Sequence, residues 1–167
     1  MHYIIIGTAH KYQRYCDYVK SELEAIFREC TPVLIAEETK SDTDKPTYGQ
    51  QIITPDRWLS IIMDKEREKD ARISEALDKE FEYIEQHNIV AYDRRAQTIR
   101  EEYWLNQIEE KCRELKITDG TVVITCGLKH LYFLADKALK RGVTRVTTLE
   151  CPSDIRQMEN LNCMHLW

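Results

Sequence analysis

Short apolar runs recur along the chain and are separated by longer stretches with helical periodicity. Most of these runs are rich in β-branched residues and do not alternate cleanly with polar ones. That pattern is typical of strands buried on both faces of a sheet. Strands are therefore predicted over residues 3–6, 33–36, 89–92, 121–125 and 143–149.

Amphipathic helices are predicted in the first half of the chain. Residues 11–30 carry one apolar stripe at helical spacing. Thr54-Pro55 is a good helix start, because a hydroxyl N-cap is followed by proline at the first helical position. The helix that follows is expected to run toward residue 84. It is either one helix with an exposed, charged middle over residues 64–70 or two helices.

Two more helices are predicted in the second half. Asp93 can cap a helix whose apolar stripe includes Trp104 and Ile108, and a last helix carrying Leu134 ends at Gly142 as its C-cap glycine. Strands and helices thus alternate. This order predicts an α/β fold with a mostly parallel sheet of four to five strands and helices on both faces, in a single domain.

Two segments fall outside this alternation. Residues 39–53 contain turn residues and no periodicity, so they are predicted to form a long loop. Long loops in compact domains often serve as lids over a binding site. Residues 152–167 are predicted to be a C-terminal tail, and their pattern indicates no particular structure.

Composition and charge narrow the function classes. The chain has 24 Lys and Arg against 29 Asp and Glu, a formal net charge of −5, so no nucleic-acid partner is expected. The apolar run at residues 3–6 is too short for a signal peptide or a membrane span, which predicts a cytoplasmic protein without membrane contact. The six cysteines show no CxxC spacing, so they are expected to be reduced and mostly buried. The three tryptophans and the tail leave room for a homo-oligomer interface.

Polar residues follow four of the predicted strands, where ligands bind in open parallel sheets. These segments are Gly7-Thr8-Ala9-His10, Glu37-Glu38, Asp93-Arg94-Arg95 and Cys126-Gly127-Leu128-Lys129-His130. Asp93 is expected to act as an N-cap, and Arg94 and Arg95 are expected to be solvated. Cys126 is expected to be a buried small side chain, with a nucleophile beside a histidine as the alternative.

The Gly-x-x-His motif occurs twice, after the first and the fourth predicted strand, and ends in His10 and His130. Each histidine alone could be a structural residue bonded to the backbone. A neutral imidazole at a strand end can also bind a divalent metal or act as a base. With Glu37, the two histidines would form a three-ligand metal site with an open position for water. Glu38 is the alternative carboxylate.

Three further side chains are candidates to contact a substrate. Arg100 shares the apolar, sheet-facing stripe of its predicted helix, so it should have an anionic partner. That partner is either Glu37 or Glu38, or a carboxylate or phosphate of a substrate. Lys129 is a second candidate to hold such an anion, and Tyr48 in the long loop is a candidate to reach the site.

Four pieces of the sequence resemble the large family that includes TraB and GumN proteins, the Tiki metalloproteases, ChaN-like haem-binding proteins and erythromycin esterases. They are Gly7-Thr8-Ala9-His10, Ile35-Ala36-Glu37-Glu38, Arg100-Glu101 followed by Trp104, and Gly127-Leu128-Lys129-His130. The resemblance implies a site built from His10, Glu37, Arg100 and His130. Glu101 stands where the family more often has Asp or Asn, and the chain is shorter than most members.

Two functions are expected on these grounds. The first is a hydrolase of a small-molecule or peptide substrate. In its metal version His10, Glu37 and His130 hold zinc, manganese or cobalt, and in its metal-free version one histidine activates water directly. The alternative is a non-catalytic module that binds or senses a small ligand or haem. Two imidazoles and Glu37 in one pocket within metal-binding distance would support the enzyme, and a histidine buried against a helix would contradict it.

Overall fold

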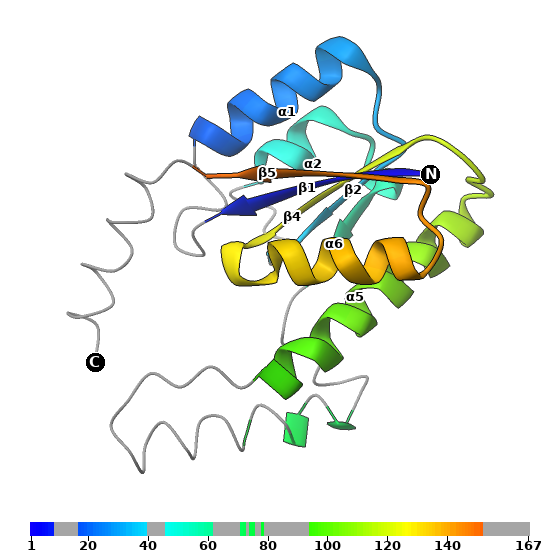
Figure 1. The fold of residues 1–167 in the computed structure, drawn as a ribbon. Helices are drawn as coiled ribbons and strands as arrows, with labels where there is room; N and C mark the ends of the chain where they lie inside the picture. The colour runs from blue at the N-terminus through cyan, green and yellow to red at the C-terminus, as the bar shows by residue number, and fades with distance from the viewer. Residues whose placement is uncertain are drawn as a thin grey trace.

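The computed structural model describes residues 1–8, 17–39, 46–61 and 94–151, together with positions 71, 72, 74, 75 and 78, which are helical. A five-stranded parallel sheet lies at the centre of this part (Figure 1). Its strands are β1 (His2–Thr8), β2 (Leu34–Glu37), β3 (Trp58–Ser60), β4 (Thr121–Gly127) and β5 (Arg145–Glu150). They lie in the order β3-β2-β4-β1-β5. The predicted α/β fold is confirmed, and every strand pair in this sheet is parallel.

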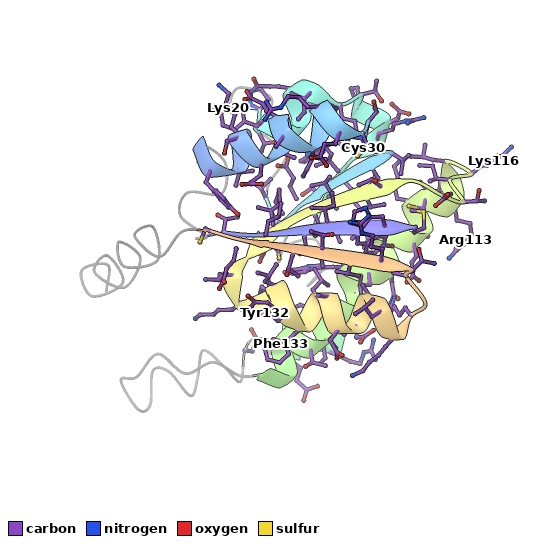
Figure 2. All side chains as sticks on the ribbon, turned by 45° about the horizontal axis from the view of Figure 1, so that its top comes forward. Lys20, Cys30, Arg113, Lys116, Tyr132 and Phe133 are labelled. Carbon is purple, nitrogen blue, oxygen red and sulfur yellow. The ribbon has the colours of Figure 1, made fainter. Side chains whose placement is uncertain are left out.

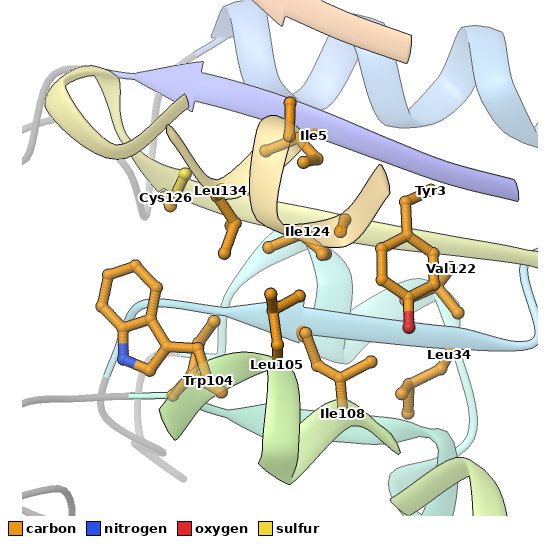
Figure 3. Close-up of a cluster of buried hydrophobic side chains, with 14 of the residues drawn as sticks. Tyr3, Ile5, Leu34, Trp104, Leu105, Ile108, Val122, Ile124, Cys126 and Leu134 are labelled. Atoms are coloured by element: carbon orange, nitrogen blue, oxygen red, sulfur yellow. The ribbon is translucent and has the colours of Figure 1, made fainter. Parts of the chain in front are cut away.

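Helices cover both faces of the sheet. The helices α1 (Asp17–Glu29) and α2 (Tyr48–Ile52) lie on one face, and α5 (Arg94–Glu114) and α6 (Leu131–Lys140) lie on the other (Figure 1). Each face has its own apolar core, because successive side chains of a strand point to opposite faces. On the α5 and α6 face, Trp104, Leu105 and Ile108 pack against strand residues such as Ile5 and Ile124 (Figure 3).

The core on the opposite face is smaller. There Val19 and Leu23 of α1 pack against Ile4 and Ile6 of β1 and Ile35 of β2. These side chains are at most 8% exposed. The apolar stripe predicted for residues 11–30 is therefore confirmed where the structure describes it, from Asp17 onward.

The helix α6 shows a two-sided pattern and a defined end. Its residues Leu131 and Leu134 face the sheet, whereas Tyr132 and Phe133 project outward and are 58% and 49% exposed (Figure 2). Gly142 follows the helix with φ +87°, and its N–H donates to the carbonyl of Leu139. The next N–H, that of Val143, donates to the carbonyl of Ala138, which completes a Schellman motif. Gly142 is thus the C-cap glycine that the sequence predicts.

The segment after Thr54 corrects the prediction of a long helix. A helical turn does begin there, but it is the three-residue 3₁₀ helix η1 (Pro55–Arg57), and β3 follows directly. The strand β3 pairs with β2, with Trp58 opposite Ile35. This pairing satisfies backbone groups on the edge of β2, so tertiary hydrogen bonding outweighs the helical spacing of the apolar residues.

The long loop predicted over residues 39–53 also needs correction, because it contains α2. Thr47 caps this helix, accepting from the backbone N–H of Gln50, while the Gln50 side chain accepts from the N–H of Thr47. This reciprocal pair is a capping box, and Thr-x-x-Gln is its sequence signature. The strand predicted over residues 89–92 and the tail 152–167 lie outside the described residues. Among the residues that are described, no helix is long and apolar enough to span a membrane.

Candidate functional site

Three neighbouring strands end at the same edge of the sheet. In the order β2-β4-β1, register places Glu37 opposite Thr125 and Thr8 opposite Gly127. The strand β4 is followed by α6 on one face, whereas its neighbours β1 and β2 are followed by α1 and α2 on the other. A crevice between strands whose connections leave to opposite faces is the usual ligand site of an open α/β sheet.

Glu38 joins β2, β4 and α5 at this edge. Its carboxylate accepts from the backbone N–H of Gly127 at 2.8 Å and from Nη2 of Arg100 at 2.7 Å. Glu38 is 9% and Arg100 is 7% exposed, so the ion pair is buried. The sequence left the partner of Arg100 open among Glu37, Glu38 and a substrate anion. The structure places Glu38 against Arg100.

Arg100 and Trp104 lie on the same side of α5, one turn apart. The guanidinium carbon lies 5.0 Å from the centroid of the indole ring, which is within the range of a cation–π contact. The spacing of four residues explains this contact, since residues i and i+4 lie on one helix face. The positive charge of Arg100 therefore lies between a carboxylate and an aromatic ring.

His130 lies at the end of the 3₁₀ helix η2 (Leu128–His130), directly before α6. Its Nδ1 lies 3.0 Å from Oε1 of Glu101 on α5, and its ring meets Trp104 edge-on with centroids 4.7 Å apart. His130 is 2% exposed and Glu101 is fully buried. One of the two Gly-x-x-His motifs thus places its histidine against a helix, which is the outcome expected to contradict the enzyme site predicted from sequence.

Burial lowers the pKa of His130, although the hydrogen bond with Glu101 opposes this shift. The imidazole is therefore neutral near pH 7. In the neutral ring, Nδ1–H donates a hydrogen bond to Oε1 of Glu101, so the lone pair that can accept a proton is on Nε2. A carboxylate that fixes the tautomer of a neutral histidine prepares that histidine to accept a proton.

Glu101 is the residue whose role the sequence reasoning missed. In the sequence it belongs to the Arg100-Glu101 piece, where it departs from the Asp or Asn that is more frequent in the family that the chain resembles. Its position three residues before Trp104 and seven before Ile108 puts it on the same apolar stripe. A carboxylate on such a stripe must be paired, so the spacing could have identified it.

Lys137 of α6 and Arg141, the C-cap residue of α6, contact carboxylates of α5. Nζ of Lys137 lies 4.0 Å from Glu101 and 2.9 Å from Glu102. Arg141 also pairs with Glu102 and lies 3.1 Å from Glu109. The hydrogen bond from Lys137 is the main cause that lowers the pKa of Glu102. These contacts tie α5 to α6 and fix the helix that carries Arg100.

Glu37 lies on the opposite face of the sheet from Glu38, as alternation along β2 requires. Its carboxylate accepts from the hydroxyl of Thr47 and from Nε1 of Trp58, the latter at 2.5 Å. A Cβ added at Gly49 would lie 2.7 Å from the carboxyl carbon of Glu37. Glu37 therefore holds α2 and β3 together, and the structure does not bring it to His130.

The remaining candidates are placed as follows. Tyr48 packs on the α1 face, with its ring 5.4 Å from Nζ of Lys20, and Lys129 is exposed on η2. Cys126 is fully buried, and burial raises the pKa of its thiol, so the protonated form is favoured. His10 and Asp93 lie outside the described residues, as do the side chains of Arg94 and Arg95.

Of the three predicted metal ligands, the described part of the chain contains Glu37 and His130, and these two do not lie together. Glu37 and His130 lie on opposite faces, and none of the described residues form a group of three His, Cys, Asp or Glu that could hold a metal ion. The polar residues that do come together are Glu38, Arg100, Glu101 and His130. Their arrangement provides an oriented base, a buried cation and two carboxylates.

Comparison with models of known protein families, with curated proteins and with solved structures finds no match for this chain. The resemblance to the TraB, Tiki and erythromycin esterase family stays a prediction from the four sequence pieces.

Proposed function

We propose that this protein is a hydrolase that cleaves esters or amides at the ends of β2 and β4. The contact between His130 and Glu101 carries this proposal, because a buried carboxylate fixes the neutral imidazole in the tautomer of a general base. The proposed site differs from the one predicted from sequence, since Glu38 and Glu101 take part in it and Glu37 does not.

In the proposed reaction, Nε2 of His130 accepts a proton from a water molecule, and the resulting hydroxide adds to the carbonyl carbon of the substrate. Negative charge develops on the carbonyl oxygen, and the guanidinium of Arg100 stabilises it. The intermediate then expels the alcohol or amine, which takes the proton back from His130. Glu38 keeps Arg100 in position through its 2.7 Å contact.

A second candidate function is a non-catalytic module that binds a small ligand. The burial of His130 against α5 favours it, together with the pairing of Arg100 by Glu38. In that case the buried ion pairs hold α5 to the sheet, and the ligand binds at the strand ends without being cleaved. Haem and other small molecules are the ligands to test.

The decisive experiment measures hydrolysis of 4-methylumbelliferyl acetate and of a peptide amide by the wild-type protein and by His130→Gln. The variant is expected to lose about 10²- to 10⁴-fold in rate, which is the usual contribution of a general base. His2→Gln is the matched control, because His2 lies at the opposite end of β1 and contacts Thr147 at 2.9 Å. It should keep the wild-type rate.

The same assay separates the alternatives. Repeating it with a chelator and with added zinc, manganese or cobalt ions tests the metal version. Equal rates for the wild type and His130→Gln would contradict the general-base role. Absence of turnover in every condition, with saturable binding of haem or a small ligand, would favour the binding module.

A further inference from the structure

Trp104 carries a buried hydrogen-bond donor without an acceptor. The residue is fully buried, and its indole Nε1 has no hydrogen-bond partner within the part of the chain that the structure describes. Folded proteins pair nearly all of their buried donors, so a water molecule or a ligand atom is expected to accept a hydrogen bond from this N–H. Its location therefore identifies where an acceptor atom is needed.

The surroundings of Trp104 place this donor at the proposed site. The ring lies 4.7 Å from the ring of His130 and 5.0 Å from the guanidinium carbon of Arg100. Figure 3 shows the indole at the end of the apolar cluster near Cys126, with its nitrogen turned away from Leu105. The unpaired N–H thus belongs to the side chain that contacts both the base and the cation.

The charges around the ring indicate what kind of acceptor fits. Two buried carboxylates lie nearby: Glu38 pairs with Arg100, and Glu101 contacts His130 with Lys137 at 4.0 Å. Because these carboxylates already have cationic partners in Arg100 and Lys137, a ligand that carries a full negative charge would add an unpaired charge to the buried site. A neutral carbonyl oxygen accepts a hydrogen bond without that cost.

We propose that the indole N–H of Trp104 donates a hydrogen bond to the carbonyl oxygen of an ester or amide ligand bound between His130 and Arg100. This inference rests on the proposed function for the place and class of the ligand, but it holds equally for a hydrolase and for a binding module. In the hydrolase, the same N–H strengthens its hydrogen bond as the carbonyl oxygen becomes negative. Trp104 is then a substrate-binding residue.

The test observes the indole N–H signals directly by ¹H–¹⁵N correlation NMR of the full chain. The chain has three tryptophans, and Trp104→Phe and Trp167→Phe assign their signals by loss of one peak each. Trp58 is the internal control, because its Nε1 already donates to Glu37 at 2.5 Å. In the free protein, we expect the Trp104 signal to lie upfield of the Trp58 signal.

Titration with N-methylacetamide then supplies a neutral carbonyl. We expect the Trp104 signal to move downfield along a saturable curve with its midpoint at about 0.1 M, since a ligand of this size binds with a Kd on the order of 0.1 M at modest efficiency. The Trp58 signal should not move. A Trp104 signal that is already downfield in the free protein, or that does not respond, would overturn the proposal. A response to acetate alone would overturn the neutral ligand class.

Turnover separates this inference from the proposed function. If the Trp104 signal responds while no ester or amide is cleaved, the donor site stands and the hydrolase fails. If cleavage depends on His130 while the Trp104 signal is unresponsive, the hydrolase stands and the donor site fails. In the hydrolase, Trp104→Phe should raise KM and lower kcat about 10²-fold, because the N–H binds the carbonyl oxygen and its hydrogen bond strengthens as that oxygen becomes negative.

Discussion

The burial of Arg100 at this site depends on its ion pair with Glu38. Arg100 is 7% exposed and is held by Glu38, which is itself 9% exposed. Removing one member of a buried ion pair leaves an uncompensated charge and costs about 3–5 kcal/mol. Loss of activity in an Arg100 variant would therefore not distinguish a catalytic role from unfolding. Changes such as His130→Gln and Trp104→Phe leave the pair of Arg100 and Glu38 intact, so they are better probes.

The buried state of His130 predicts how stability changes with pH. Burial lowers its pKa in the folded protein, whereas the unfolded chain titrates near the ordinary value of about 6.5. Between these two values the unfolded chain binds more protons, so the free energy of unfolding falls as the pH falls. This contribution is at most about 1.4 kcal/mol per pH unit. His130→Gln removes it.

Urea unfolding of the wild type and of His130→Gln at pH 7.5, 6.5 and 5.5 measures this contribution. The stability advantage of the wild type should shrink as the solution is acidified below about pH 6.5. Burial also lowers the pKa of His2, but His2 contributes equally to both proteins. An advantage that is constant or grows on acidification would contradict a lowered pKa for His130.

The choice between Glu37 and Glu38 shows what residue-level reasoning from sequence cannot settle. The two are neighbours at the end of one strand, so they necessarily point to opposite faces. Nothing in the local sequence states which face α5 covers. Only the packing of Trp104 and Ile108 against Ala36, on the side of Glu38, decides that Glu38 meets Arg100.

Among the helices and strands, the sequence pattern did not predict the short elements β3 and α2. The strand β3 has three residues, and its pairing with β2 is what makes it a strand. The helix α2 has five residues and rests on the Thr47 capping box and on the Glu37 contact below it. Long elements such as α5 carry their own periodic signal, whereas these two depend on partners distant in sequence.

Substitutions at Gly49 and Gly142 test how the contacts of α2 and the C-cap of α6 contribute to stability. A Cβ at Gly142 meets no atom within 4 Å, so Gly142→Ala costs only the strain of φ +87°, about 1 kcal/mol. A Cβ at Gly49 would lie 2.7 Å from the Glu37 carboxyl, which must then leave Thr47 and Trp58. Gly49→Ala should therefore cost more, about 3 kcal/mol.

Thermal and urea unfolding of the two variants give the comparison. Gly142→Asn should be milder than Gly142→Ala, because asparagine tolerates the left-handed conformation better. If Gly49→Ala were as stable as the wild type, the proposed clamp between Glu37 and α2 would be wrong.

For the whole molecule, the sheet order predicts where protection from hydrogen exchange is greatest. The strand β4 lies between β2 and β1, and the residues Val122–Ile124 are fully buried. The edge strand β5 is only partly buried, and β3 has three residues. Amide exchange followed by mass spectrometry should be slowest in β4 and β1 and faster in β3 and β5. Faster exchange in β4 than in β5 would contradict this order.

The sequence predicted the architecture better than the site. The runs at residues 3–6, 33–36, 121–125 and 143–149 and two long amphipathic stripes sufficed for four of the five described strands and for a helical layer on each face, whereas the predicted strand 89–92 lies outside the described residues and β3 was missed. They also placed Arg100 and His130 at the same sheet edge. The pairing of His130 with Glu101, and the unpaired N–H of Trp104, depend on how α5 is rotated over the sheet. The rotation of α5 about its axis is set by packing against α6, so the spacing of apolar residues along α5 does not predict it.

The opposite orientation of Glu37 and Glu38 also bears on how the chain avoids misfolding. One carboxylate anchors α2 and β3 above the sheet, and the next anchors α5 and β4 below it. If β2 slipped by one residue, both carboxylates would exchange faces and lose their donors together, while Ile35 and Ala36 would exchange cores. The two consecutive glutamates therefore act as a register lock, which penalises an incorrect alignment of β2 on both faces at once.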